Sequence, residues 1–402
     1  MIMRLSSVQI FQQGISAILA QQGKLGHTEQ QLATGRRVLT PSDDPVAAVQ
    51  IMDITGDLDL VDQYQRNGNL AQGQLALEET VLVDVGNVLQ RVRELVVQAN
   101  NASQSPETRR SIATEVTARI DELQALANTR GASGEYIFAG FQAQSEPFSR
   151  QGNGFTYNGD DGQRFLQLGS STQVAVRDSG FDVFMSIASG NGTFAIEPDA
   201  GNTGTAVAGS SSASNAFVSD DYTISFSQLA INDPVTYQVT DSTAAVVASG
   251  NYVAGDTIDF VGASIGFDGA PADGDSFQVT SAVKQDMFTT LRNIADYLNG
   301  SGSSPAEIAV VNNAMGQALE NIDQALGNVL QVRADVGVRL NHVENQLNIN
   351  ESFNVQLQET LSGIQDLDYA EAISRFNLEL TALQAAQQAY VKMQGLSLFN
   401  YL

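Results

Sequence analysis

Two kinds of residue in this chain could bind a metal ion: its two histidines, and clusters of Asp and Asn side chains. His27 and His342 lie far apart in the sequence, and no HExxH motif pairs them as a zinc protease would. We read both as surface or interface side chains. Two sets of oxygen ligands could bind calcium, but neither has the spacing of an EF-hand loop. These sets are Asp268, Asp273 and Asp275, and Asn158, Asp160 and Asp161. Asp and Asn are common in β-turns, which explains both sets.

The sequence also lacks the residues expected for a cysteine nucleophile or a phosphate-binding loop. The chain has no cysteine, which excludes thiolate nucleophiles, disulfides and cysteine zinc sites. The glycine-rich stretches near 190 and at 201–209 lack the lysine of a P-loop. Nothing marks a cleft around the adjacent carboxylates at 43–44 or 220–221. We therefore expect no enzyme, no cofactor and no metal site.

The charge balance restricts the partners. The 402 residues carry a formal net charge of -25, so the surface repels nucleic acid and anionic lipid. Gln and Ser interrupt the apolar residues of 1–22, and no small-residue cleavage site follows. That segment is expected to be neither a cleaved signal peptide nor a membrane span.

The two ends of the chain have helical periodicity. A heptad stripe runs through 6–33, with polar residues in two of its slots. Its apolar members are Val8, Phe11, Ile15, Ile18, Leu25 and Leu32. Thr34-Gly35 ends this helix, and apolar periodicity at 75–96 and 112–123 predicts two more. A turn is expected between them, from Asn100 to Pro106.

The centre of the chain predicts β-structure. Turn residues and alternating runs indicate β elements at 131–180, including a hairpin over 155–168 closed at 158–162. Residues 178–283 contain thirteen acidic residues and no Lys or Arg. Their short alternating runs predict a small all-β domain of the sandwich kind, and the Gly/Ser/Ala stretch 200–216 predicts a flexible lead-in. The aromatic residues of the domain are expected to fill its core.

Helices return at Lys284. Met287, Leu291, Ile294 and Leu298 share one helical face, and Ser304-Pro305 begins a long helix whose stripe is wide enough for several partners. The last segment carries a further apolar stripe. Its members are Tyr369, Ile373, Phe376, Leu380, Leu383 and Tyr390.

Both terminal stripes require partners. Each buries too little apolar surface to offset the conformational entropy of ordering its own segment, and short isolated helices are marginal in water. The partners could be the opposite terminus or copies in neighbouring subunits. A chain whose apolar stripes lie at its two ends is suited to polymerise.

The segment TPSDDP at 40–45 predicts a helix start. Ser42 can cap the helix, Asp43 and Asp44 lie where the helix dipole favours negative charge, and Pro45 loses no bonded N–H in the first turn. We expect the second long helix to begin here.

Three segments resemble a known family. TGRRVLTPSDDPVAA at 34–48, GEYIFAGFQAQSEPF at 134–148 and the C-terminal LDYAEAISRFNLELTALQAAQQAYVKMQGLSLFNYL at 367–402 are similar to the hook-associated (FlgL) class of the flagellin superfamily. The strand-rich stretch within 222–280 resembles a β domain found inserted in hook-associated proteins. The resemblance spans most of the chain, although the ending LSLFNYL differs from the shorter ending expected of flagellin.

The resemblance implies an α+β structural protein. A long antiparallel helical rod and coiled coil, formed by the N- and C-terminal regions, would carry β hairpin elements and an inserted all-β domain. The expected divisions are 1–43 (coil and link), 44–194 (rod helices and β elements), 195–283 (inserted domain), 284–365 (rod helices) and 366–402 (coil). Gly35, Arg36, Arg37, Ser42, Asp43, Asp44 and Pro45 would form the link. The polymer interface would hold both stripes and four further C-terminal residues, Leu396, Leu398, Phe399 and Leu402.

By the same resemblance, the chain would be a subunit of the hook–filament junction of the bacterial flagellum. It would be extracellular and exported without a cleaved signal peptide. Its partners would be the hook-side hook-associated protein, flagellin, copies of itself in a ring, and a cytoplasmic flagellar export chaperone. Two alternatives stay open: flagellin itself, and a secreted binding or adhesin module in which the acidic β domain reads a carbohydrate.

Overall fold

The computed structural model describes the chain except for residues 1–6, 102, 153, 231–232 and 396–402. The chain divides into two compact units. The terminal unit comprises Met1–Arg66 and Gln346–Leu402, and the central unit comprises Asn67–Asn345. The predicted fold class, terminal helical regions with an inserted β-rich domain, is confirmed. The five-part division at 43, 194, 283 and 365 stays a prediction.

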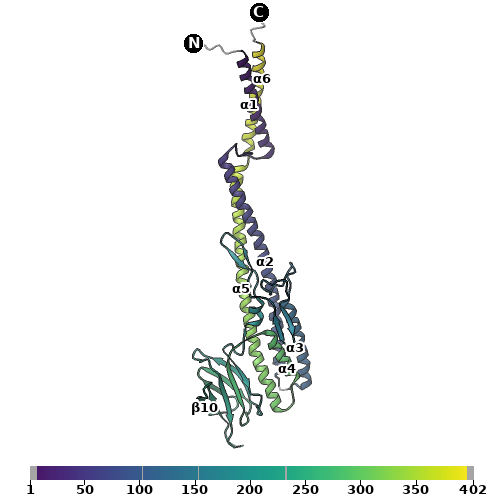
Figure 1. The fold of residues 1–402 in the computed structure, drawn as a ribbon, viewed down its shortest axis with the longest axis vertical. Helices are drawn as coiled ribbons and strands as arrows, with labels where there is room; N and C mark the ends of the chain where they lie inside the picture. Colours follow the sequence, from purple (N-terminus) through teal and green to yellow (C-terminus); the bar gives the residue numbers. More distant parts are fainter. Residues whose placement is uncertain (1–6, 102, 153, 231–232, 396–402) are drawn as a thin grey trace. The chain divides into compact units, whose positions relative to one another are not determined.

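The terminal unit is helical. Helix α1 (Ser7–Thr34) packs against α6 (Tyr369–Gly395), and the two lie side by side in Figure 1. The first part of α2 (Pro45–Ala99) meets the last part of α5 (Pro305–Gln365), where Asn354 donates a hydrogen bond to the Asp62 carboxylate at 2.9 Å.

The central unit holds the rest of α2 and α5 with α3 (Pro106–Ala127) and α4 (Met287–Asn299). Ion pairs tie α2 to α5, from Arg333 to Glu79 at 2.7 Å and from Arg93 to Asp323 at 2.7 Å. Because the later α2 residue pairs with the earlier α5 residue, the two helices are antiparallel. The predicted apolar stripes of α2 and α4 are fully buried. They comprise Leu75, Leu82, Val85, Leu89, Val92, Val96, Met287, Leu291, Ile294 and Leu298.

Side-chain caps fix where these helices begin. Ser105 accepts the N–H of Thr108 at the start of α3, next to Pro106. At the start of α5, Ser304 and Glu307 form a capping box: Glu307 accepts the N–H of Ser304 at 2.9 Å, and Ser304 accepts the N–H of Glu307 at 3.3 Å. The helix start predicted at Ser304-Pro305 is confirmed.

Three small antiparallel sheets join the helices of the central unit. They are β1 (Phe148–Gln151) with β2 (Gly154–Tyr157), β3 (Phe165–Gln167) with β4 (Gln173–Ala175), and β5 (Ile187–Ala188) with β14 (Lys284–Gln285). A single π-helical turn, η1 (Phe181–Met185), precedes β5. Aromatic rings join these pieces, with Phe288 of α4 at 4.5 Å from Phe155 and 5.3 Å from Phe148, between ring centroids.

The hairpin predicted over 155–168 is wrong, because β2 pairs with β1 and β3 pairs with β4. The reason lies in Asp160. Its carboxylate accepts the N–H groups of Phe141 at 2.8 Å and Gly162 at 2.9 Å, while the Tyr157 hydroxyl donates to the carbonyl of Phe138. Residues 158–162 are therefore bound to 138–141 and do not form a hairpin turn.

The inserted β domain is two antiparallel sheets around one core. The larger sheet has the order β10 (Val246–Asn251), β9 (Thr236–Thr240), β8 (Tyr222–Ser227), β13 (Ser276–Ser281) and β6 (Phe194–Pro198). The smaller has the order β11 (Thr257–Phe260), β12 (Ala263–Asp268) and β7 (Val207–Ala213). Both sheets send buried side chains into the shared core, as expected of a sandwich. The predicted core aromatics Tyr222, Phe226, Tyr252, Phe260, Phe267 and Phe277 are buried there, and Tyr237 packs against them half-buried.

The flexible lead-in predicted at 200–216 is also wrong, because β7 occupies its centre and pairs with β12. Helix α5 stabilises this strand from the side. The Asn313 carboxamide, which is 5% exposed, accepts the N–H of Ala208 at 2.8 Å and donates to the carbonyl of Ala206 at 2.9 Å. It therefore bonds the edge of β7 much as a neighbouring strand would.

Candidate assembly interface

The predicted link begins with a left-handed glycine. Gly35 has φ +70 and donates its N–H to the carbonyl of Gln31 at 2.8 Å, which ends α1. A Cβ at this position would lie 2.9 Å from the hydroxyl of Tyr369. Both the backbone conformation and the close approach of α6 therefore favour glycine.

The segment that connects α1 to α2 is hydrogen-bonded to the segment that connects α5 to α6. Arg36 forms an antiparallel β-bridge with Asp366. The N–H of Arg37 donates to Gln365 at 2.7 Å, and the N–H of Leu367 donates to Gly35 at 2.9 Å. The passage from α1 to α2 and the passage from α5 to α6 thus form a single joint within the terminal unit.

The side chain of Arg37 also stabilises this joint. Its guanidinium donates to the carbonyl of Ile364 at 2.9 Å, in the last turn of α5, and lies 3.5 Å from the Asp44 carboxylate. A cation is favourable at a helix C-terminus, where unpaired carbonyls gather. Arg37 therefore joins the end of α5 to the start of α2.

Asp43 fixes the turn that leads into α2. Its carboxylate accepts the N–H groups of Thr40 at 2.8 Å and Leu39 at 3.0 Å, and lies 3.0 Å from Nε2 of His27 on α1. These interactions, the Thr40 N–H foremost, hold the pKa of Asp43 below its ordinary value. Asp43 thus connects the turn to α1.

Ser42, predicted to cap α2, does not do so. Its hydroxyl bonds that of Thr40 at 2.7 Å. The cap is Asp44, which accepts the N–H of Ala47 at 3.0 Å directly before Pro45 opens the helix. That hydrogen bond is the main cause that lowers the pKa of Asp44. Asp44 and not Ser42 caps α2 because Asp44 directly precedes the first helical residue. From that position a side-chain oxygen reaches the N–H of the third helical residue.

The two predicted terminal stripes are only partly covered. Phe11 and Tyr390 meet edge to face at 6.0 Å, and Leu383 is buried. Half-buried members are Phe11, Ile18, Leu25, Leu32, Phe376 and Tyr390. Exposed members are Ile15, Tyr369, Ile373 and Leu380. The side chain of Val8 and residues Leu396, Leu398, Phe399 and Leu402 lie outside the described residues.

Polar residues that sequence reasoning missed also join α1 to α6. Thr28 is buried and donates to the Glu379 carboxylate at 2.8 Å, and Gln21 donates to the Glu379 carbonyl at 3.3 Å. Buried Gln31 bonds the link and not α6, since it donates to the carbonyl of Arg37 at 2.6 Å. None of these residues lies in an apolar heptad slot, so the periodicity gave no signal for them.

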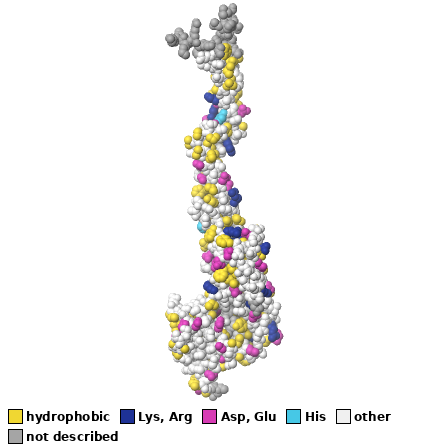
Figure 2. Space-filling model, in the orientation of Figure 1, with side chains coloured by type: hydrophobic (Ala, Val, Ile, Leu, Met, Phe, Trp, Pro, Cys, Tyr) yellow, Lys and Arg dark blue, Asp and Glu magenta, His cyan; other side chains and the backbone are white. Residues whose placement is uncertain are grey.

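A second missed set is apolar and exposed. Val46, Val49 and Met52 follow one another at three-residue spacing on α2, with exposed fractions of 69%, 59% and 73%. On α5 of the same unit, Phe353 and Val355 are more than half exposed. Apolar side chains recur on the helical surface in Figure 2. So many exposed apolar residues indicate a surface that other protein covers.

The residues considered for chemistry have structural duties. The Asp275 carboxylate accepts the N–H groups of Thr203, Gly204 and Ala272, and the Asn158 side chain donates to Ser149. Across the described residues, no three His, Asp or Glu side chains converge to hold a metal ion. The described helices include none long and apolar enough to cross a membrane.

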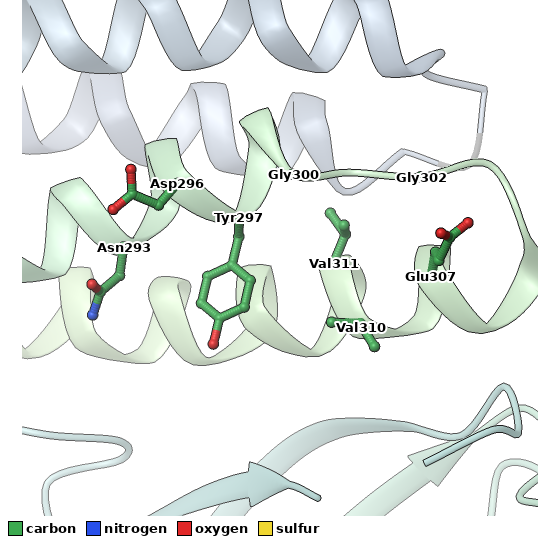
Figure 3. A pocket seen from close by; sticks show the side chains of 8 residues that line it. All are labelled: Asn293, Asp296, Tyr297, Gly300, Gly302, Glu307, Val310 and Val311. Carbon is green, nitrogen blue, oxygen red and sulfur yellow. The ribbon is translucent and has the colours of Figure 1, made fainter. Parts of the chain in front are cut away.

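A surface pocket of about 490 Å³ lies between the end of α4 and the start of α5 (Figure 3). Its two carboxylates are already engaged, Glu307 in the capping box and Asp296 with Arg292 at 3.5 Å. Tyr297 and Val310 form an exposed apolar part of its wall. This arrangement offers no reactive group.

Comparison with known proteins agrees with a role in assembly. The bacterial flagellin N-terminal helical region matches residues 7–143, and the C-terminal helical region matches 319–402. Flagellar hook-associated protein 3 of Escherichia coli is 27% identical, over 99% of each chain. The crystal structure of hook-associated protein 3 from Legionella pneumophila has a TM-score of 0.75 at 35% identity, covering 78% of this chain and 98% of its own. FlgL of Xanthomonas campestris has a TM-score of 0.72 at 33% identity, covering 77% and 99%.

The two matched regions are both named for flagellin, so they do not by themselves separate a hook-associated protein from a filament protein. The likeness to the Legionella and Xanthomonas proteins separates the two, because it extends over more than three quarters of the chain at about one-third identity. This chain belongs to the family of flagellar hook-associated protein 3, FlgL.

Proposed function

We propose that this chain is the structural subunit that joins hook to filament, and that it polymerises through its terminal helices. The observation that carries the proposal is the terminal unit itself. Its helices expose apolar residues on α1, α2, α5 and α6, which a solitary protein would leave in water. Family membership supplies the context, because relatives bear the names hook-associated protein and flagellar junction protein.

The mechanism is adaptation between two lattices. One end of a layer of copies accepts the hook-side hook-associated protein, and the other receives the first flagellin subunits. The terminal stripes form the polymer interface. The link consists of Gly35, Arg36, Arg37, Ser42, Asp43, Asp44 and Pro45. The subunit acts outside the cell after export, and a cytoplasmic chaperone covers its C-terminal stripe until then.

Two alternatives predict different outcomes. A flagellin would be distributed along the whole filament. An adhesin would bind glycan through the β domain, yet the aromatic rings that could stack on a sugar are mostly in its core, which weighs against this reading. No reactive site is needed for any of the three roles.

The deciding experiment locates the chain on intact flagella. A cell lacking its own copy receives the full chain with a single surface cysteine in the β domain, which a dye can label specifically because the sequence has no other cysteine. A fluorescent band confined to the hook–filament boundary is the expected result. Label along the filament would favour flagellin, and label absent from flagella would contradict both structural roles.

A further inference from the structure

Two adjacent arginines of the link behave differently. The guanidinium of Arg37 bonds two groups of its own chain, the Ile364 carbonyl and the Asp44 carboxylate. Arg36 contributes its backbone, through the bridge to Asp366 and an N–H bond to Thr34. Its side chain is exposed, and over the described part of the chain its guanidinium makes no hydrogen bond or ion pair.

A groove of about 850 Å³ opens in the terminal unit beside these arginines. Six carboxylates line it: Asp43, Asp44, Asp366, Asp368, Glu371 and Glu379. Three cations line it as well, Lys24, Arg37 and Arg375, and two of these pair with groove carboxylates, Arg37 with Asp44 and Arg375 with Glu371 at 3.4 Å. The groove therefore has surplus negative charge, and Glu371, whose side chain is 74% exposed, is an accessible carboxylate in it.

Symmetry matches this groove to Arg36 of another copy. In a head-to-tail array of copies, each contact joins one patch of a copy to a different patch of its neighbour. Arg36 and the groove belong to the same joint, so neighbouring copies that meet at the joint bring one to the other. Exposed Val46, Tyr369 and Ile373 beside the joint are apolar surface that such a neighbour would cover.

We propose that, in the assembled junction, Arg36 of one copy binds the acidic groove of the next copy, with Glu371 as its main partner. This inference rests on the proposed function, since it requires copies to adjoin one another. It assigns the link a second duty: besides connecting helices within a chain, it sets the register between chains. A head-to-tail contact of this kind repeats around a ring without a special end copy.

Charge exchange tests the pairing in the full chain. Arg36→Glu should reduce the number of hooks bearing filaments roughly tenfold or more, because like charges would then face each other. Glu371→Arg should do the same, and the double exchange R36E/E371R should restore filaments. Arg66→Glu, at another exposed arginine of the terminal unit, is the matched control and should assemble normally.

Cross-linking tests the contact directly. One population of chains carries only Arg36→Cys and a second carries only Glu371→Cys, so a disulfide between these positions must join two copies. Flagella assembled from the mixture should yield a covalent dimer on mild oxidation. A mixture of Arg66→Cys and Glu371→Cys chains should not.

The outcomes separate this inference from the proposed function. If the wild-type chain is found at the junction but R36E assembles normally and no 36–371 dimer forms, the pairing is wrong and the junction role stands. If R36E lowers the melting temperature of the purified monomer, Arg36 acts within its own chain and the inference is overturned. Absence of the wild-type chain from the junction would overturn the function itself.

Discussion

Glu78 on α2 accepts the backbone N–H of Asp178 at 2.9 Å through one carboxylate oxygen, while the other oxygen, Oε2, is buried without a partner among the described residues. Burial and, secondarily, the charge of Asp178 raise the pKa of Glu78 to about 8. The Asp178 N–H and the charges of Arg339 and Arg177 oppose this shift without cancelling it. Glu78 is therefore mostly protonated in the folded chain at neutral pH.

This relationship predicts an unusual dependence of stability on pH. The pKa of Glu78 is raised from 4.5 in the folded state, so folding takes up a proton between about pH 4.5 and 8. Its contribution to stability is complete below that window and falls as pH rises through it, by about 1.4 kcal/mol per pH unit. Glu78→Gln keeps the shape without the titration, so its stability relative to wild type should rise with pH.

Urea unfolding of both proteins at pH 5, 6, 7 and 8 measures this difference. Glu94→Gln serves as the control, since the Glu94 side chain is 67% exposed. Parallel pH profiles for wild type and E78Q would show that Glu78 is ionised in the folded chain.

A second prediction separates the two capping candidates of α2. Asp44→Ala removes the acceptor of the Ala47 N–H and the partner of Arg37, and should lower the melting temperature of the purified chain by roughly 2–4 °C. Ser42→Ala loses only a bond to the Thr40 hydroxyl and should leave it almost unchanged. Assembly should suffer more than melting in the Asp44 variant, because the joint loses its angle.

Differential scanning calorimetry and a count of filament-bearing hooks measure the two effects. Equal behaviour of the Asp44 and Ser42 variants would contradict the assignment of the cap. Because the pKa of Asp44 is lowered in the folded chain, its contribution is present above pH 3.8 and disappears as pH falls through the folded value.

A third prediction concerns removal of the β domain. The chain enters and leaves it at one place, where Phe194 pairs with Ser281 and the N–H of Ala282 donates to Thr193 at 2.9 Å. A short glycine linker can therefore replace residues 195–280, within the predicted domain 195–283. The helix surface uncovered by this deletion carries small side chains such as Ala314 and Ala318 and polar ones such as Asn313, so the remainder should fold and still form junctions.

Filament number on cells producing the shortened chain is the measurement, with secretion of the protein as its control. Loss of filaments by a secreted, folded chain would mean that the β domain makes necessary polymer contacts.

The sequence predicted those features whose cause lies nearby in the chain. The α2 stripe and the helix start at Ser304-Pro305 depend on residues close together in the chain, and both are present. The errors involve distant partners. Strand β7 has the composition of a linker, and Asn313, more than one hundred residues away, bonds its edge. The turn at 158–162 is bound to Phe141 through Asp160, which no local pattern reveals.

The candidate interface shows the same division. Periodicity identified the stripes of α1 and α6, whereas it did not distinguish the members that face each other from those left exposed, such as Ile373. The exposed residues on α2 were missed, although the three-residue spacing of Val46, Val49 and Met52 is visible in the sequence. A second stripe on a helix already assigned to a core is the signal that could have found them.

The final prediction is that residues 7–33 and 369–395 are disordered in the free monomer and helical in the assembled flagellum. Both segments carry apolar stripes at heptad spacing, so helix is their ordered state. Pairing α1 with α6 still leaves Ile15 at 45% and Ile373 at 50% exposed, so each helix gains only part of the burial needed to offset its ordering entropy. Neighbouring copies supply the rest, which makes ordering and polymerisation one event.

Hydrogen exchange on a purified, verified monomer tests this directly. Exchange across 369–395 should approach the rate of an unfolded peptide, while the buried α2 residues around Leu82 and Leu89 stay protected. In assembled flagella the same terminal segment should become protected. Slow exchange there in the monomer would mean that α1 and α6 suffice for each other. Removal of 391–402 gives an independent test: it should abolish motility if neighbours pack on that end, and normal motility would contradict coupled ordering.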